Sequence, residues 1–405
     1  MKYILSILIP TKDRYDYLKH LMALVYKYQL SDLEVVIQDN SSDNTDFKKF
    51  ISGRKIENIK YFYTAESIPI SSNVDLAIKH STGEYICVIG DDDGFLPNIV
   101  ECAKWMKKNN IDAMTPALTT YNWPNFNYIS LGRRRGELRH KKFSYNVTKK
   151  DVRTELKQLA RRGFTHIQTI PKFYHGIVNR KCADEVYEIG GKFCPGPSPD
   201  MASAVALCFT VKKFVTIDLP VIIVGQGEFV GGGEYKLKGG VKDIKNVPHL
   251  PKNAKEEWSK QIPRVWCSET VWPESAIKAL EYMGKKDEIY VDYEFIIAKF
   301  IYLHSKSYKL AIGLCTRRVF CAFYLSYFIV SGFYYRAQGI LLKIIKKSFS
   351  KDFSKYNKKE DNLESIAEAS DWIQKNYTTY SEARAVAKLE FRENSRFEKY
   401  ESRPN

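Results

Sequence analysis

Three successive carboxylates, Asp91, Asp92 and Asp93, follow the apolar run at 85–89 and precede a glycine. Adjacent anions repel one another, so a fold that keeps them together needs a compensating cation. Mg²⁺ binds through one or two carboxylates and takes its remaining ligands from water and substrate phosphates, and Mn²⁺ prefers similar oxygen ligands. The sequence therefore predicts a divalent-metal site here. A solvated acidic turn before a helix is the alternative.

Two further polar segments follow apolar runs. Asp39 comes after the run at 33–37, where its carboxylate can accept a hydrogen bond from a nucleobase N–H or a ribose hydroxyl. The segment 9–14 holds Thr11 and Asp13, which can bind a ribose, and Lys12 and Arg14, either of which can meet phosphate charge. A plain turn with a helix cap is the alternative for this segment.

Short apolar runs alternate with helical periodicity through the first part of the chain. Such alternation is typical of an α/β fold with a mainly parallel sheet flanked by helices. Ligands of these sheets bind at the carboxyl ends of the strands, where all three polar segments lie. Strands are predicted at 4–9, 33–37, 59–63, 85–89, 111–115, 174–179 and 211–224.

The order and spacing of five segments resemble family 2 glycosyltransferases of the GT-A fold, of the type that builds bacterial surface polysaccharides. The resemblance covers residues 4–115 well and 166–223 loosely. The segments that carry it are 9–14, 38–45, 71–77, 82–86 and 90–97.

The resemblance implies roles for individual residues. Asp39 would contact the donor base, Asn73 would line the donor pocket, and Asp91 to Asp93 match the DxD element that holds Mn²⁺ or Mg²⁺ on the donor diphosphate. Asp93 and then Asp91 are favoured as metal ligands, with Gly90 standing where many members carry another acidic residue. The donor is a nucleotide-diphosphate sugar, with UDP favoured. The expected substrate-binding residues are Pro10, Thr11, Asp13, Arg14, Asp39, Asn73, Asp91 and Asp92.

An inverting transfer also needs a base, because a neutral hydroxyl is a weak nucleophile. The resemblance points to Asp200, in a Pro-rich segment before a predicted helix, as this catalytic carboxylate; an N-capping aspartate is the alternative. His166 and His175 are read as structural residues or as contacts to acceptor or phosphate. His249 is a weaker candidate for reaching the metal.

Composition divides the chain and limits its partners. The formal net charge is +16, and 306–359 carries 12 basic residues against 1 acidic, while 133–162 carries 12 against 3. We expect a GT-A catalytic domain at 1–225, a glycine-rich loop or lid at 226–250, and a mostly helical region at 251–405. The eight cysteines form no CxxC pair, and no signal peptide is evident, so we expect a cytoplasmic protein with reduced thiols.

The basic segment 306–359 predicts contact with an anionic membrane. Its uncharged run at 319–335 has 17 residues, short of the roughly 20 that a span needs. Apolar residues at 337–345 then recur on one helical face, beside lysines, as in a helix lying in the interface. We therefore expect a peripheral protein on the inner face of the cell membrane, acting on a lipid-linked saccharide. A buried helical hairpin is the alternative.

Other functions explain less of the sequence. Nucleic-acid binding without catalysis would use the charge, but carboxylates at 91–93 would repel phosphate, so we expect no nucleic-acid partner. A sugar nucleotidyltransferase would be expected to carry a glycine-rich phosphate loop near the first strand, and none is evident. Processive synthases are disfavoured because Gln261, Arg264 and Trp266 are spaced one residue too far for their motif. The oligomeric state, a homo-oligomer included, stays open.

Overall fold

The computed structural model describes residues 3–53, 57–126, 134–140, 143–228, 241–247, 250–251, 253–348, 358–360, 362–376 and 390–391. For 335–348, 358–360 and 390–391 only the backbone is described. Most of the predicted glycine-rich lid, and His249, lie outside these residues. The predictions made for them stay predictions.

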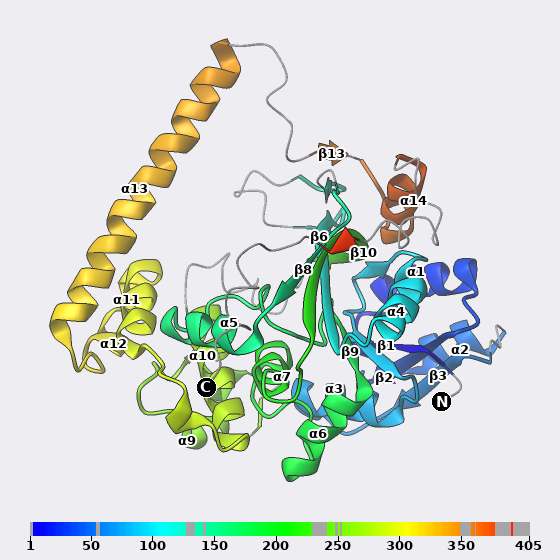
Figure 1. Cartoon of the computed structure of the whole chain (residues 1–405), viewed down its shortest axis with the longest axis horizontal. Helices are drawn as coiled ribbons and strands as arrows, with labels where there is room; N and C mark the ends of the chain where they lie inside the picture. Colours follow the sequence, from blue (N-terminus) through cyan, green and yellow to red (C-terminus); the bar gives the residue numbers. More distant parts are fainter. Residues whose placement is uncertain are drawn as a thin grey trace, which may run out of the picture.

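The described residues build a central twelve-stranded sheet with helices on both faces (Figure 1). Six strands, β1, β2, β3, β4, β6 and β10, run parallel to one another, and β9 lies antiparallel between β4 and β6. The predicted α/β class with a mainly parallel sheet flanked by helices is therefore confirmed. The strands are β1 (Leu5–Thr11), β2 (Leu33–Asp39), β3 (Ile59–Tyr63), β4 (Tyr85–Val88), β5 (Gly94–Phe95), β6 (Ala113–Asn122), β7 (Leu138–His140), β8 (Asn146–Lys150), β9 (Ile177–Asn179), β10 (Phe214–Gln226), β13 (Lys358–Glu360) and β14 (Glu390–Phe391), with a separate pair, β11 (Lys242–Asp243) and β12 (Val265–Trp266).

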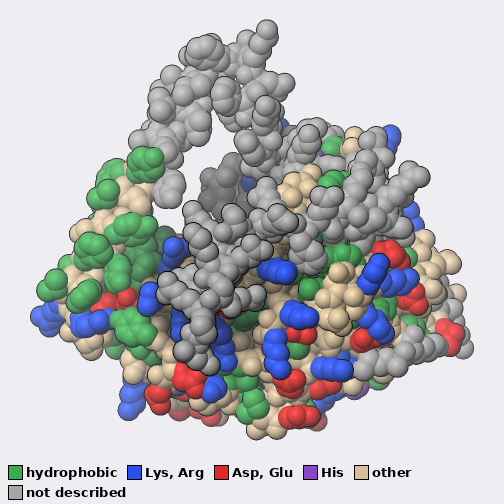
Figure 2. Space-filling model, in the orientation of Figure 1, with side chains coloured by type: hydrophobic (Ala, Val, Ile, Leu, Met, Phe, Trp, Pro, Cys, Tyr) green, Lys and Arg blue, Asp and Glu red, His purple; other side chains and the backbone are tan. Residues whose placement is uncertain are grey.

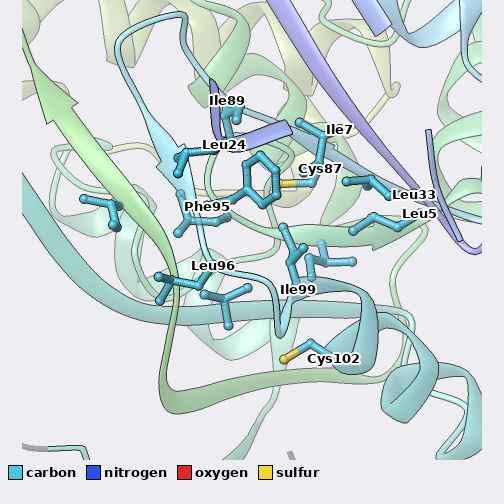
Figure 3. Packing of buried hydrophobic residues seen from close by; sticks show 14 of the residues in the cluster. Leu5, Ile7, Leu24, Leu33, Cys87, Ile89, Phe95, Leu96, Ile99 and Cys102 are labelled. Atoms are coloured by element: carbon cyan, nitrogen blue, oxygen red, sulfur yellow. The ribbon is translucent and has the colours of Figure 1, made fainter. Parts of the chain in front are cut away.

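Alternate residues of the buried strands supply two apolar cores, one on each face of the sheet. In β1, Leu5 and Ile7 enter the first core and Leu8 the second. Figure 3 shows Leu5 and Ile7 packed with Cys87, Phe95 and neighbouring residues of the first core. Because side chains alternate between the faces of a strand, these runs are apolar on both sides, as expected of strands covered by helices on each face.

The helices divide between these two cores. Helices α1, α2, α4 and α14 contribute to the first core, and α3, α5, α6, α7 and α10 to the second. Beyond the sheet, α10 to α13 form a mostly helical region (Figure 1). The helices are α1 (Tyr15–Tyr28), α2 (Thr45–Ser52), α3 (Ile70–His80), α4 (Ile99–Lys108), α5 (Val152–Arg161), α6 (Arg180–Gly190), α7 (Pro199–Leu207), α9 (Ala254–Glu257), α10 (Ser268–Tyr282), α11 (Tyr293–Leu303), α12 (Lys309–Ile312), α13 (Arg318–Ser348) and α14 (Ile366–Asn376).

The last described helix, α14, returns to the N-terminal half of the chain. Its Ile366, Ala369 and Ile373 are buried in the first core, and the Tyr121 hydroxyl donates a hydrogen bond to the Leu363 carbonyl. The expected division at 225 and 250 stays a prediction. The structure adds that a segment near the C-terminus packs on the domain expected at 1–225.

The strand predicted at 174–179 is shorter in the structure. His175 has a φ of 59°, a left-handed conformation that interrupts extended backbone. The three residues from Ile177 to Asn179 then pair with β4 and β6, while Tyr174 makes an isolated bridge with Val88. This break directs the His175 side chain to the end of β4, as described below.

Helix α13 merges the two segments predicted at 319–335 and 337–345 into one helix. It packs on α11 through aromatic contacts of Phe295 with Tyr324 and of Phe295 with Phe328. Between residues 319 and 334 many of its other apolar side chains are exposed, and Figure 2 shows a green region there beside blue basic residues. Among the described residues, no helix is long and apolar enough to cross a membrane.

Candidate active site

The carboxyl ends of three adjacent parallel strands bring the predicted segments together. Thr11 ends β1 and is the register partner of Asp39, which ends β2. Asp91 follows β4, the other neighbour of β1, and its Oδ2 accepts a hydrogen bond of 2.7 Å from Thr11 Oγ1. Segments 80 residues apart therefore form one polar edge of the sheet.

Arg14 neutralises part of the aspartate cluster. Its Nη1 lies 3.1 Å from Asp91 Oδ1 and its Nη2 lies 2.8 Å from Asp92 Oδ2. Burial raises the pKa of Asp91 and of Asp92, whereas the positive charge of Arg14 acts in the opposite direction on both. One guanidinium thus pairs with two of the three buried carboxylates, so the cluster retains room for further positive charge. The phosphate contact expected of Arg14 stays a prediction, since this side chain is engaged by the aspartates here.

Asp93 is held by backbone amides and a histidine. Its Oδ2 accepts hydrogen bonds from the Gly90 amide at 2.6 Å and lies 2.8 Å from His175 Nε2, and its Oδ1 accepts from the Gly225 amide at 2.8 Å. Asp92 Oδ2 accepts a longer bond from the Gly227 amide. The start of the glycine-rich segment, at the end of β10, is therefore part of the site.

Two tyrosine hydroxyls and a backbone amide donate hydrogen bonds to the Asp39 carboxylate. Tyr15 and Tyr61 each donate a hydrogen bond of 2.6 Å to Asp39 Oδ2, and the Ser41 amide donates to Oδ1. Burial and these bonds to the carboxylate raise the pKa of both phenols, so both remain donors at neutral pH. Asp39 itself is fully buried. A nucleobase approaching Asp39 would therefore meet the two tyrosines as well.

The other predicted donor-site residues lie along the same edge. Asp13 has a φ of 55°, and its Oδ1 accepts hydrogen bonds from the amide and hydroxyl of Ser42. Pro10, within β1, pairs with Gln38. Asn73 of α3 donates from Nδ2 to the carbonyls of Thr11 and Gln38, at 3.4 and 3.3 Å. Asn73 Oδ1 is buried and has no hydrogen-bond partner among the described residues, so it can receive a ligand donor.

The comparison with protein families decides the class of this site. Residues 6–165 match the family model described as "Glycosyl transferase family 2". This segment belongs to glycosyltransferase family 2. The family predicted from the sequence is therefore confirmed for this segment, which contains every predicted donor-site residue and the aspartate cluster. Asp200 lies beyond it.

Relatives of this glycosyltransferase domain are distant. A curated protein of Rickettsia bellii (strain RML369-C), named "Uncharacterized glycosyltransferase", is 31% identical over 108 residues, which are 26% of this chain and 15% of the relative. The solved structure of S. aureus TarS 1–349 aligns with a TM-score of 0.42 at 13% identity, covering 80% of this chain and 89% of that one. The same protein in complex with UDP-GlcNAc aligns with a TM-score of 0.43 at 14% identity, with the same coverage.

The aspartate cluster of the glycosyltransferase domain fits a divalent cation. Asp91 Oδ1 is buried and accepts no hydrogen bond among the described residues, although Arg14 lies near it. Hard oxygen ligands of this kind suit Mg²⁺ or Mn²⁺. Both carboxylate oxygens of Asp93 accept hydrogen bonds within the protein. Asp91 Oδ1 is thus less engaged by hydrogen bonds than either oxygen of Asp93, and the ligand order expected from the sequence, Asp93 and then Asp91, stays a prediction.

Asp200 lies in the first turn of α7, after the predicted Pro-rich turn. Its carboxylate accepts a hydrogen bond from the Ser198 hydroxyl, and Ser198 is the N-cap. Burial raises the pKa of Tyr174, and the charges of Asp200, Asp93 and Asp91 act in the same direction. The catalytic role expected of Asp200 stays a prediction.

Several site residues were not predicted from the sequence. Tyr15 and Tyr61 lie on a helix and a strand where apolar burial explains an aromatic residue, so no local signal distinguishes them. Lys172 is almost fully buried, and burial lowers its pKa to about 8, against the opposing effect of Asp200. The sequence predicts a structural role for His175 or a contact with acceptor or phosphate, and its bond to Asp93 places it against the aspartate cluster. His166 has its pKa lowered by burial, and no hydrogen bond joins it to the cluster among the described contacts.

Proposed function

We propose that this chain moves one sugar from a nucleotide-diphosphate sugar to a hydroxyl of a saccharide acceptor, with inversion at the anomeric carbon. The observation that carries the proposal is the meeting of Asp39, Thr11 and Asp91 at the carboxyl ends of β2, β1 and β4. In an open α/β sheet this edge is where a nucleotide binds. The base would lie near Asp39 and its tyrosines, and the diphosphate near the aspartate cluster.

The negative charge of the aspartate cluster and the donor diphosphate requires a further cation. Asp91 to Asp93 and the donor diphosphate are all anionic, and Arg14 supplies a single positive charge. A Mn²⁺ or Mg²⁺ ion held by Asp91 and its neighbours would neutralise the leaving diphosphate. Asn73 Oδ1 can accept a donor hydroxyl, and Asp13 can orient the ribose.

Asp200 is proposed as the general base. Its carboxylate takes the proton from the acceptor hydroxyl while that oxygen forms a bond to the anomeric carbon. The bond from this carbon to the diphosphate oxygen breaks, and the nucleoside diphosphate leaves with the electron pair. Attack on the face opposite the leaving group inverts the configuration. The Ser198 hydroxyl holds the carboxylate that receives the proton.

Calorimetry with UDP, GDP, dTDP and CDP tests the donor site. Each nucleotide is titrated into the native chain with Mn²⁺, with Mg²⁺ and with a chelator, and then into Asp91→Asn and Asp93→Ala. We expect metal-dependent binding of one nucleotide, UDP first, and at least about a tenfold loss in Asp91→Asn. Metal-independent binding unaffected by both substitutions would remove the cluster from the site. Absence of binding by all four nucleotides would overturn the proposal.

We further propose that the acceptor is lipid-linked, in surface polysaccharide assembly, and that α13 rests on the anionic membrane. Val319, Phe323 and Val330 are 81%, 66% and 67% exposed, and their spacing puts them on one face of the helix. Lys306, Lys309 and Arg318 are exposed near its base. Apolar side chains beside basic ones suit an interface of acyl chains and anionic headgroups.

Vesicle sedimentation tests this surface. We expect the chain to bind vesicles of anionic phospholipid and to bind neutral phosphatidylcholine vesicles much less. The combined substitution Val319→Ser, Phe323→Ser and Val330→Ser should abolish binding, whereas Ile189→Ser, which removes an exposed apolar side chain of α6, should not. Equal binding by the triple variant and the native chain would contradict the assignment of α13.

A further inference from the structure

A second cluster of metal-binding side chains lies outside the glycosyltransferase site. Cys267 precedes α10, Glu269 lies in the first turn of that helix, and His304 follows the last residue of α11. One ligand atom from each residue, a sulfur, an oxygen and a nitrogen, lies within 4.8 Å of the other two. His304 Nε2 and Glu269 Oε2 are 2.9 Å apart. None of the three is a residue of the donor or catalytic site described above.

We infer that Cys267, Glu269 and His304 bind a zinc ion that clamps the start of α10 to the end of α11. Zinc is the metal that a thiolate, an imidazole and a carboxylate suit together, because it accepts sulfur, nitrogen and oxygen ligands in a tetrahedral arrangement. Mg²⁺ and Mn²⁺ prefer oxygen ligands alone, so the aspartate cluster and this cluster select different metals. Three protein ligands leave the fourth position to water.

The local electrostatics suit a dication. Although burial opposes it, the hydrogen bond from His304 lowers the pKa of Glu269, which keeps this side chain ionised. Burial and the Glu269 charge raise the pKa of the Cys267 thiol to about 12, so the metal must displace the thiol proton as it binds. A thiolate and a carboxylate together balance the charge of Zn²⁺. His304 also caps the end of α11, where the helix carbonyls favour positive charge.

The zinc ion would hold the end of α11 in place, and α13 packs on α11. Residues 283–292 connect the end of α10 to the start of α11, so the zinc would join the opposite ends of these two helices. Helix α11 in turn holds α13, because Glu294 accepts hydrogen bonds from Arg317 and Thr316 and because Asp292 accepts one from Tyr324. Figure 1 shows α11 and α12 beside the base of α13. Zinc at the start of α10 would therefore stabilise the placement of α13 against the rest of the chain.

Cobalt substitution tests the site directly. Co²⁺ added to the metal-free 405-residue chain should give a thiolate-to-cobalt charge-transfer band in the near ultraviolet, saturating at one equivalent, and Zn²⁺ should displace it. Cys267→Ser should abolish the band, and His304→Gln should weaken Zn²⁺ binding by more than about 100-fold, because loss of even an outer partner costs 10–100-fold. Cys315→Ser, which removes a less buried cysteine of the same region, should leave the band unchanged.

The zinc inference is separable from the proposed sugar transfer. Asp91→Asn should leave the cobalt band intact, and Cys267→Ser should leave metal-dependent nucleotide binding intact. Thermal unfolding provides a second readout that does not depend on the spectrum. Zn²⁺ should raise the melting temperature of the native chain and of Cys315→Ser, and it should raise those of Cys267→Ser and Glu269→Gln much less. A charge-transfer band absent from the native chain, or one that survives in Cys267→Ser, would overturn the inference.

Discussion

Arg14 Nη2 lies 2.8 Å from Asp92 Oδ2, inside a cluster of three buried carboxylates. The same guanidinium reaches Asp91. Although burial opposes it, the charges of Asp91 and Asp92 raise the pKa of Arg14, so it stays a cation. Arg14 therefore supplies part of the positive charge that a bound metal would complete. Removing Arg14 separates its contribution from that of the metal.

Arg14→Met should destabilise the metal-free chain by about 3 kcal/mol, because breaking a buried ion pair leaves uncompensated charge. Mn²⁺ should then raise the melting temperature of the variant more than that of the native chain, since it supplies the missing positive charge. Lys104→Met, which removes an exposed ion pair with Asp32, serves as control and should change stability by less than about 1 kcal/mol. An equal Mn²⁺ effect in native chain and variant would argue against metal binding at this cluster.

Gly225 approaches the same cluster through the backbone. A Cβ at this position would lie 1.7 Å from the Asp92 carbonyl oxygen, and the Gly225 amide donates to Asp93. Gly225→Ala should therefore displace β10 from the cluster, lowering stability by about 2 kcal/mol or more and weakening nucleotide binding. Gly53→Ala, where a Cβ meets nothing within 4 Å, is the matched control. Urea unfolding measures the stability of the two variants, and calorimetry measures their nucleotide binding. Equal stabilities would show that the backbone at residue 225 shifts to accommodate the added Cβ at little cost.

Tyr61 and Tyr63 lie on the same strand but bond to different groups. Tyr61 donates to the Asp39 carboxylate, whereas Tyr63 donates to the Ser41 carbonyl. Tyr61→Phe leaves a buried carboxylate with one donor fewer, so we expect a loss of about 1–3 kcal/mol in stability and weaker binding of the preferred nucleotide. Tyr63→Phe should have a smaller effect on both. If both variants bind every nucleotide as the native chain does, Asp39 does not contact the base.

The sequence predicted the parts of the site that follow a strand. Asp39 and Asp91 were identified because apolar runs precede them, and parallel strands bring their carboxyl ends to one edge. The tyrosines around Asp39 could not be predicted, because their contacts depend on how α1 and β3 pack beside β2. The return of α14 to the first core depends likewise on contacts between distant segments, which periodicity does not encode. Short elements such as β9 were misjudged because a single residue, His175, takes a left-handed conformation.

Asp200→Asn should separate catalysis from donor binding. The amide keeps the size of the side chain but cannot take the acceptor proton, so we expect transfer to slow by about 10²–10⁴-fold. Metal-dependent nucleotide binding should be unchanged, as measured by calorimetry. Ser198→Ala, which removes only the hydroxyl that holds Asp200, should reduce the rate less. A variant that transfers sugar at the native rate would assign the proton to another group.

Lys172 makes stability depend on pH in the alkaline range. Burial lowers the pKa of this side chain to about 8, below its ordinary value of 10.5, and its Nζ donates to Gln168. Between these two values the unfolded chain binds more protons than the folded chain, so this group makes the native state more stable as pH rises. Relative to Lys172→Met, the native chain should gain about 1.4 kcal/mol per pH unit between pH 8 and 10. Urea unfolding of both proteins across this range measures the gain.

Lys181→Met, at an exposed position of α6, should show no such trend relative to the native chain. A difference between native chain and Lys172→Met that stays constant with pH would mean that the buried ammonium keeps its ordinary pKa, stabilised by neighbours such as Gln168 and Asp200.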